Sequence, residues 1–319
     1  KTSHFTAYLI LKKGKPVVIT NPLEYRLLLG RKSFTTLQAG KNEYLKGILK
    51  KNMGKKIGLN YSHVSVASFK KIKSLLKGRK FIDVSEYMSD IRSVKTKEEI
   101  KNIKEACRIT EEMFSYLQTI LKKGITEKEI ADEIEIKTKR LGADGMAFPP
   151  IIASGKNSAI PHHRPGGTGL TEGILLADIG VIYNGYCSDM TRTFFVGEPG
   201  AMHNHMYSVV NKARKDAIGI ARAGTKSKDV FDAANSIIKK NYNCDMIHSL
   251  GHGLGIEVHD YPQGLSSNSG FVLKKDMCLA IEPAYYKEGF GGMRIEDDVV
   301  VGNGKAKLLS KAPDRLVVL

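Results

Sequence analysis

Two acidic side chains, Asp178 and Asp189, stand in an otherwise apolar segment, LLADIGVIYNGYCSDMTRTFFV. Between them lies Asn184-Gly185, a dipeptide typical of a two-residue β-hairpin turn. This turn would place Asp178 opposite Thr191, so that both acids point to one face of the hairpin, with Cα atoms roughly 7–8 Å apart. Buried there, two carboxylates would repel each other unless a cation lay between them. Two solvated acids on an exposed hairpin face are an equally good interpretation of this segment alone.

The second half of the chain repeats this arrangement. The segment EGILLADIG aligns with DMCLAIEPA, which places Asp178 on Glu282, and the next strand of each copy carries a further acid, Asp189 or Glu296. Each strand pair follows two predicted helices, which span residues 98–122 and 132–141 in one copy and 202–222 and 230–242 in the other. The repeat predicts an α+β fold of duplicated helix-helix-hairpin units, with helices packed on one face of a curved antiparallel sheet.

The repeat also predicts a metal centre. Four carboxylates at equivalent positions carry a charge of about −4, which two divalent cations would neutralise. His252 lies between two glycines, and a neutral imidazole is a suitable fifth ligand beside carboxylates. His259 is better placed to donate a hydrogen bond to a reacting group, and one histidine of the pair His162 and His163 is a further candidate. Three other histidines are predicted to be structural or on the surface: His203, His205 and His248.

Residues 1–90 are predicted to form a separate small α/β domain. Residues 91–319 are predicted to form a second domain, which carries the candidate metal centre. Short β-like runs alternate with amphipathic helices in the first of these, and Thr96 with Glu99 forms a capping box at the start of a long helix in the second. No first strand is recognisable in the small domain and the chain begins with Lys1 rather than Met, so we expect its start to be truncated.

Composition bears on partners and location. The chain has 50 Lys and Arg against 33 Asp and Glu, a net charge of +17, which raises the possibility of a nucleic-acid ligand. The lysines are spread along the chain without an RNA-binding or zinc-finger signature, so solvated helix faces explain them better. No apolar run approaches the ~20 residues of a membrane span. The four cysteines are scattered without a CxxC motif, which predicts reduced thiols in a cytoplasmic protein.

These motifs resemble those of the pita-bread (M24-type) metallopeptidases. The resemblance covers residues from about 96 to 319 and rests on LADIG, YCSDMTRTFFVG, HSLGHGLGIEVHDYP, LAIEP and GGMRIEDDVVV. Two further segments, DIRSVKTKEEI and ASGKNSAIPHHRPG, resemble the prolidase and aminopeptidase P branch of the family, as does a small creatinase-like N-terminal domain.

The resemblance implies a set of site residues and a cofactor. The ligands of two divalent ions, Mn²⁺ or Co²⁺ before Zn²⁺ or Fe²⁺, would be Asp178, Asp189, His252, Glu282 and Glu296. Asp189 and Glu296 would bridge the ions, His252 and Glu282 would bind one of them, and Asp178 mainly the other. His162 and His259 would face the substrate, Tyr286 would help to bind it, and Arg294 would brace the bridging acid. A homodimer through the N-terminal domain is also implied.

Such a centre predicts peptide hydrolysis. Two metal ions lower the pKa of a shared water so that a bridging hydroxide forms near neutral pH. Glu282 would act as the general base, and His162 or His259 would donate to the developing oxyanion. The resemblance implies an Xaa-Pro dipeptidase, or alternatively an aminopeptidase P that accepts longer peptides. A pita-bread protein without catalysis, binding nucleic acid or protein, is motivated by the charge of +17, and a creatinase-like enzyme would work without metal.

Overall fold

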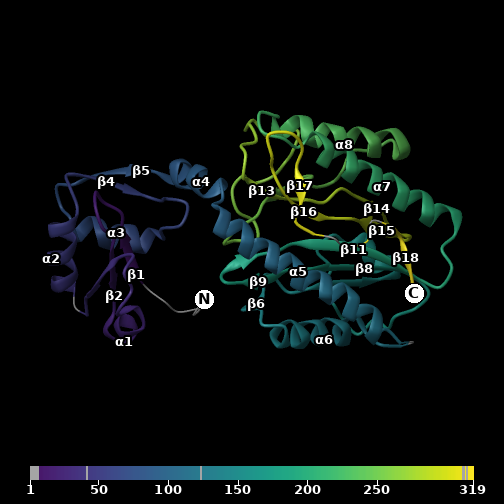
Figure 1. Cartoon of the computed structure of the whole chain (residues 1–319), viewed down its shortest axis with the longest axis horizontal. Helices are drawn as coiled ribbons and strands as arrows, with labels where there is room; N and C mark the ends of the chain where they lie inside the picture. The colour runs from purple at the N-terminus through teal and green to yellow at the C-terminus, as the bar shows by residue number, and fades with distance from the viewer. Residues whose placement is uncertain (1–6, 41, 123, 311–312, 314) are drawn as a thin grey trace. The chain divides into compact units, whose positions relative to one another are not determined.

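The structure, a computed structural model, describes residues 7–40, 42–122, 124–310, 313 and 315–319 (Figure 1). The chain divides into two compact units, Lys1–Met88 and Ser89–Leu319. The predicted domain limits, 1–90 and 91–319, lie two residues from this division and stay a prediction.

The first unit is a small α/β fold with its own apolar core. Its three-stranded sheet has the order β1-β2-β3, with an antiparallel hairpin followed by a parallel neighbour, and a second pair, β4 and β5, is parallel. Ile19, Leu49 and Leu76 lie in the core between strands and helices. The elements are β1 (Ala7–Ile10), β2 (Val17–Thr20), α1 (Pro22–Tyr25), η1 (Arg26–Leu28), β3 (Thr35–Gln38), α2 (Asn42–Asn52), β4 (Lys56–Leu59), α3 (Val66–Leu75) and β5 (Lys80–Asp83).

Capping boxes mark the starts of two helices of the second unit. Helix α4 (Ser85–Ser93) crosses the division, and α5 (Lys97–Ile120) starts at the predicted capping box of Thr96 and Glu99. The predicted start of α6 at residue 132 is wrong, because a second capping box, formed by Thr126 and Glu129, starts the helix five residues earlier. The other helices are α6 (Glu127–Arg140), α7 (Ala201–Ile220) and α8 (Ser227–Tyr242), the last beginning three residues before its predicted start.

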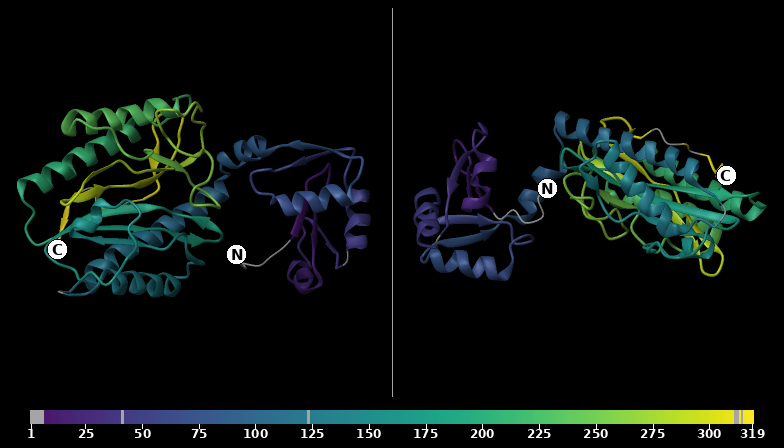
Figure 2. Two further views of the ribbon diagram at one scale, coloured as in Figure 1. Left: turned by 180° about the vertical axis from the view of Figure 1, so that it is seen from behind. Right: turned by 90° about the horizontal axis from the view of Figure 1, so that it is seen from below.

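Two four-stranded sheets form the centre of this unit, in the orders β18-β11-β8-β7 and β12-β13-β16-β17. Helices α5 and α6 pack on the first, and α7 and α8 on strands of the second repeat (Figures 1 and 2). The first repeat contributes β6 (Gly145–Met146), β7 (Ile151–Ser154), η2 (Gly155–Ala159), β8 (Gly173–Ile179), β9 (Val181–Tyr183), β10 (Tyr186–Cys187) and β11 (Met190–Val196). The remaining strands are β12 (Gly251–Gly253), β13 (Cys278–Ile281), β14 (Ala284–Lys287), β15 (Gly291–Arg294), β16 (Asp297–Val300), β17 (Lys307–Leu308) and β18 (Val317–Val318).

The hairpin of the first repeat has the predicted register. Asn184 and Gly185 take φ values of 48° and 78°, the positive values that this two-residue turn requires. Asp178 pairs with Thr191 between β8 and β11, as the turn predicts. Among the described residues, no helix combines the length and the hydropathy needed to cross a membrane.

Candidate metal centre

The two repeats place their acids at matching ends of matching strands. Asp178 lies near the end of β8 and Glu282 directly follows β13, while Asp189 directly precedes β11 and Glu296 directly precedes β16. His252 is the middle residue of β12. All five line one cavity of about 680 Å³. The structure therefore brings together, from five elements, all the residues that the sequence predicts as metal ligands.

Their donor atoms form three overlapping groups, each with atoms within 4.8 Å of one another. Nε2 of His252 lies 3.4 Å from Asp189 Oδ2 and 3.8 Å from Glu282 Oε1. Glu296 belongs to two of the groups, which is the geometry expected of an acid shared by two ions. The groups are Asp178, Asp189 and Glu296; His252, Glu282 and Glu296; and Asp189, His252 and His259.

Burial and charge indicate that this donor set fits divalent cations. Asp178 Oδ1 is buried and has no hydrogen-bond partner among the described residues, so one of its lone pairs is available to a cation. Burial, together with the charges of neighbouring carboxylates, raises the pKa of Asp178 and raises that of Asp189 and Glu296 well above the usual range. Carboxylates and one imidazole are ligands that divalent transition metals accept, and two such ions would balance the crowded charge.

His252 is oriented as a ligand by its other ring nitrogen. Nδ1–H donates to the carbonyl of Gly253 at 3.1 Å, which leaves the lone pair of Nε2 facing the acids. Gly253 itself has no room for a side chain, because a Cβ there would lie 2.4 Å from the carbonyl oxygen of Tyr261. The glycine after His252 therefore permits the close approach of the loop that carries His259.

Arg294 has a different direct partner from the predicted one. We expected it to brace the bridging acid, but its Nη2 donates to Asp178 at 2.6 Å. Its Nε donates to Thr191 Oγ1 at 2.9 Å, and that hydroxyl donates to Glu296 at 2.6 Å. Thr191 thus links the guanidinium to Glu296, the predicted bridging acid, through two hydrogen bonds.

Tyr286 and His248 continue this chain of hydrogen bonds. Arg294 Nη1 donates to the Tyr286 hydroxyl at 2.7 Å, and that hydroxyl lies 3.2 Å from His248 Nε2. Since His248 Nδ1–H donates to the carbonyl of Ser249, Nε2 is free to accept from the tyrosine. Burial raises the pKa of Tyr286 to about 12, which keeps the hydroxyl protonated. His248, which we predicted to be structural or on the surface, lines the cavity.

The predicted substrate-side histidines lie at the mouth of the cavity. His162 and His259 are exposed and line it, and the His259 ring centroid lies 4.1 Å from that of His252. Although His259 is exposed as a residue, partial desolvation of its ring lowers its pKa and favours the neutral form. Positive charge on His252 and His162 would act in the same direction. His163 instead places Nε2 at 2.7 Å from the buried carboxylate of Glu127.

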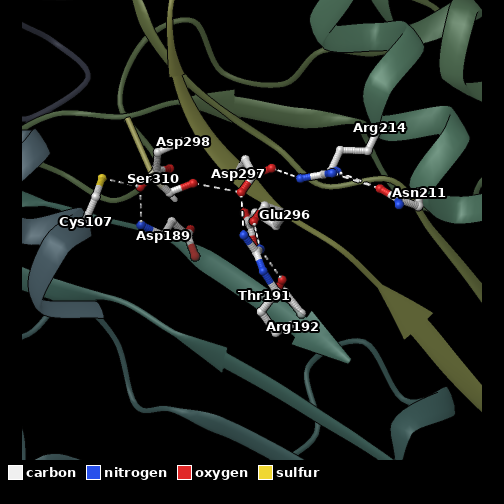
Figure 3. Close-up of polar contacts among 10 residues, drawn as sticks. All are labelled: Cys107, Asp189, Thr191, Arg192, Asn211, Arg214, Glu296, Asp297, Asp298 and Ser310. Atoms are coloured by element: carbon white, nitrogen blue, oxygen red, sulfur yellow. Dashed lines mark hydrogen bonds and ion pairs between the residues drawn. The ribbon is translucent and has the colours of Figure 1, made fainter. Parts of the chain in front are cut away.

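A buried ionic network supports Glu296 from behind (Figure 3). Arg192 donates from Nη1 to the carbonyl of Glu296 and from Nη2 to Asp297 at 2.6 Å. Arg214, from α7, forms an ion pair with the other oxygen of Asp297, and Ser310 donates to the same carboxylate at 2.8 Å. The backbone of Glu296 is thereby connected to α7.

Asp298 plays the corresponding part for Asp189 (Figure 3). Its Oδ2 accepts from the backbone N–H of Asp189 at 2.9 Å and from Sγ–H of Cys107 at 3.2 Å. Burial raises the pKa of Asp298 to about 7. Two consecutive acids thus hold the backbones of the two residues predicted to bridge the ions, a role that the sequence analysis did not identify.

The Asp297 network predicts a large effect on stability. Asp297→Asn removes the buried carboxylate with which both Arg192 and Arg214 pair, and we expect a loss of about 3–5 kcal/mol in the free energy of unfolding. Urea denaturation measures this loss. Asp216→Asn, which breaks an exposed ion pair with Lys212 on α7, is the matched control and should cost less than about 1 kcal/mol. Similar losses in the two variants would contradict the assigned role of Asp297.

Solved structures and curated proteins resemble the chain over nearly its whole length. The Xaa-Pro dipeptidase of Pyrococcus furiosus is 34% identical over 97% of this chain and 88% of its own. An X-Pro aminopeptidase from Thermotoga maritima superposes with a TM-score of 0.92 at 31% identity, covering 98% of this chain and 90% of that one. An Xaa-Pro dipeptidase from Bacillus anthracis gives a TM-score of 0.94 at 29% identity, covering 99% and 90%.

Family signatures match both units. The creatinase/prolidase N-terminal domain matches residues 1–94, and metallopeptidase family M24 matches residues 101–303, a segment that holds all five predicted ligands. The creatinase-like N-terminal domain and the pita-bread fold predicted from the sequence are confirmed by these matches and by the solved structures. The chain belongs to metallopeptidase family M24.

Proposed function

We propose that this protein is a metal-dependent Xaa-Pro dipeptidase. The observation that carries the proposal is the convergence of Asp178, Asp189, His252, Glu282 and Glu296 in one cavity. In this proposal Asp189 and Glu296 would be shared by two divalent ions, His252 and Glu282 would hold one of them, and Asp178 would hold the other. Carboxylates with a single imidazole suit Mn²⁺ or Co²⁺, with Zn²⁺ and Fe²⁺ as further possibilities.

The metal ions and Glu282 have separate roles in hydrolysis. When bound, two such ions supply Lewis acidity and make water easier to deprotonate near neutral pH. Glu282 is the least buried of the four acids, with 19% of its side chain exposed, and is placed to take a proton from the attacking water. The same carboxyl group then passes that proton to the leaving proline nitrogen.

Histidines at the mouth of the cavity act on the substrate. His162 and His259 donate hydrogen bonds to the oxygen that becomes negatively charged in the transition state, an effect of roughly 10²–10³-fold in comparable sites. Arg294 lines the cavity and holds Asp178 in place. Tyr286, predicted to help bind the substrate, is not among the lining residues and acts through Arg294, whose Nη1 donates to its hydroxyl.

Arg164 supports a dipeptide as the substrate. This exposed side chain lines the same cavity and, within the described part of the chain, makes no hydrogen bond or ion pair. The other arginine of the lining, Arg294, is already paired with Asp178. A dipeptide places its C-terminal carboxylate one residue after the scissile bond, where a free guanidinium would bind it.

Hydrolysis of Ala-Pro and Ala-Pro-Ala by metal-stripped protein, with Mn²⁺ or Co²⁺ restored, tests the proposal. We expect metal-dependent cleavage that favours Ala-Pro, and a rise of roughly 10-fold in KM for Ala-Pro in Arg164→Ala. Lys156→Ala, in the same loop but outside the cavity lining, is the control. Preference for the tripeptide would indicate an Xaa-Pro aminopeptidase instead. No cleavage of either peptide, with metal bound, would rule out the Xaa-Pro function.

We also propose a homodimer through the N-terminal unit and a cytoplasmic location. Large exposed apolar side chains in that unit, such as Leu11 at 60% and Leu23 at 88%, support an interface. The four cysteines are free thiols, which fits a reducing compartment. Sedimentation equilibrium measures the assembly, and a mass of one chain would exclude the dimer.

A further inference from the structure

One buried carboxylate lies outside the metal centre and collects four hydrogen bonds. Glu127, the first residue of α6, is 1% exposed. Its Oε1 accepts from the backbone N–H of Ser154 at 2.8 Å and from Nδ2 of Asn157 at 2.9 Å. Its Oε2 accepts from Nε2 of His163 at 2.7 Å and from the backbone N–H of Gly166 at 3.2 Å. Two oxygens thus hold four donors spread over thirteen residues of the chain.

These contacts keep Glu127 ionised. Burial alone would raise its pKa, but the hydrogen bonds from Ser154, Asn157, His163 and Gly166 outweigh burial and lower the pKa below its usual value. Its position at the N-terminus of α6 also favours a negative charge.

The same helix start holds the backbone of the loop formed by residues 155–168. Glu127 N–H donates to the carbonyl of Thr168 at 3.0 Å, and Lys128 N–H donates to that of Gly166 at 3.0 Å. The Asn157 side chain also donates to the Thr168 hydroxyl at 3.2 Å. Both ends of the loop and its centre are therefore fixed to one point of α6.

His162 lies in the centre of this loop, between two residues that are themselves held. The carbonyl of Pro161 accepts from Arg294 Nη1 at 3.3 Å, and the ring of His163 is bonded to Glu127. With both neighbours fixed, the backbone from which the His162 imidazole extends has little freedom. Among the described residues, the hydrogen bonds of the Glu127 carboxylate go to none of the five predicted metal ligands, so any effect on them is indirect.

We propose that Glu127 is a positioning residue that fixes His162 at the mouth of the metal centre by holding loop 155–168. The inference rests on the proposed function, in which His162 donates a hydrogen bond to the reacting substrate. A carboxylate that only stabilised the start of α6 would lower stability when replaced, but it would not act through His162.

Glu127→Gln tests the proposal with a change of about one atom. The amide has one oxygen, which can accept from only two of the four donors. Its NH₂ group then faces a backbone N–H, that of Ser154 or that of Gly166, depending on the orientation of the amide. Glu129→Gln is the matched control, because Glu129 lies two residues away at the same helix start. Its hydrogen bonds to the cap residue can also be made by an amide oxygen. Asn157→Ala removes one donor, leaves Glu127 in place, and serves if Glu127→Gln folds poorly.

Kinetics on Ala-Pro form the first readout. We expect kcat in Glu127→Gln to fall roughly 10–100-fold with metal affinity unchanged, and a smaller fall in the same direction in Asn157→Ala. If Glu127 acts through His162, the double variant Glu127→Gln/His162→Ala is no slower than His162→Ala alone. Fully additive losses, or loss of metal affinity in Glu127→Gln, would overturn the proposal.

Hydrogen exchange supplies a readout that does not depend on catalysis. Amides of residues 155–168 should exchange faster in Glu127→Gln and in Asn157→Ala than in Glu129→Gln and the wild type. Unchanged exchange in both variants would overturn the inference even if the wild type cleaves Ala-Pro. If the two variants exchange faster but the wild-type protein binds metal and cleaves no Xaa-Pro peptide, the role of Glu127 in holding the loop would stand and the proposed function would be refuted.

Discussion

Asp189→Asn lowers metal-dependent hydrolysis of Ala-Pro by about 10³-fold or more. Asp189 belongs to two of the three donor groups, with His252 and His259 and with Asp178 and Glu296. An amide contributes no negative charge and cannot bridge two cations as a carboxylate does, so Lewis-acid stabilisation worth several kcal/mol is lost. Initial rates measured over a series of Mn²⁺ concentrations give the size of the effect and the accompanying loss of metal affinity.

Stability distinguishes this loss from misfolding. Without metal, the Asp189→Asn variant lacks a buried carboxyl group whose ionisation the fold disfavours, and we expect it to unfold at a higher temperature than metal-free wild type at pH 7. Asp132→Asn, on the exposed face of α6, is the control and should leave both activity and melting temperature unchanged. Full activity of Asp189→Asn at restored metal would refute its assignment as a ligand.

Removal of metal by chelation destabilises the protein more at pH 8 than at pH 5. The pKa values of Asp178, Asp189 and Glu296 are raised in the metal-free fold, with burial as the largest cause. In the unfolded chain such groups titrate near pH 4, so above that pH the folded form holds more protons than the unfolded form. Stability of the metal-free protein therefore falls as pH rises from about 4 towards the raised pKa values.

The measurement compares melting temperatures with excess Mn²⁺ and with a chelator at both pH values. Metal at about 1,000 times its dissociation constant adds about 4 kcal/mol to the folded state, and activity disappears with the metal. Metal-free Asp189→Asn should show a shallower pH dependence than metal-free wild type. An apo protein that becomes more stable between pH 5 and pH 8 would contradict the electrostatic account of the centre.

Local patterns predicted most of the fold and the set of candidate ligands. The Asn184-Gly185 turn alone predicted that Asp178 pairs with Thr191, because a two-residue turn leaves one register available. The start of α6 was missed although its signal is local, since Thr126 and Glu129 have the spacing of a capping box. Strand and turn chemistry act over a few residues and can therefore be recognised in a sequence.

The supporting contacts could not be predicted in the same way. Arg294 and Asp178 are 116 residues apart, and Asp298 and Asp189 are 109 apart. No periodicity relates such pairs, and their partners depend on how two hairpins face each other. His248 shows the same limit, because its partner Tyr286 lies 38 residues away in the chain.

Several of the bonds that hold the centre cross from one repeat to the other. Asp298 receives the N–H of Asp189, and Glu296 donates its own N–H to the carbonyl of Thr191 at 3.1 Å. Strand β18 then pairs in parallel with β11, so the end of the second repeat completes the sheet of the first. During synthesis on the ribosome, the first repeat therefore emerges with Asp178 and Asp189 lacking their partners. The complete set of predicted ligands consequently exists only after both repeats have been made and have docked.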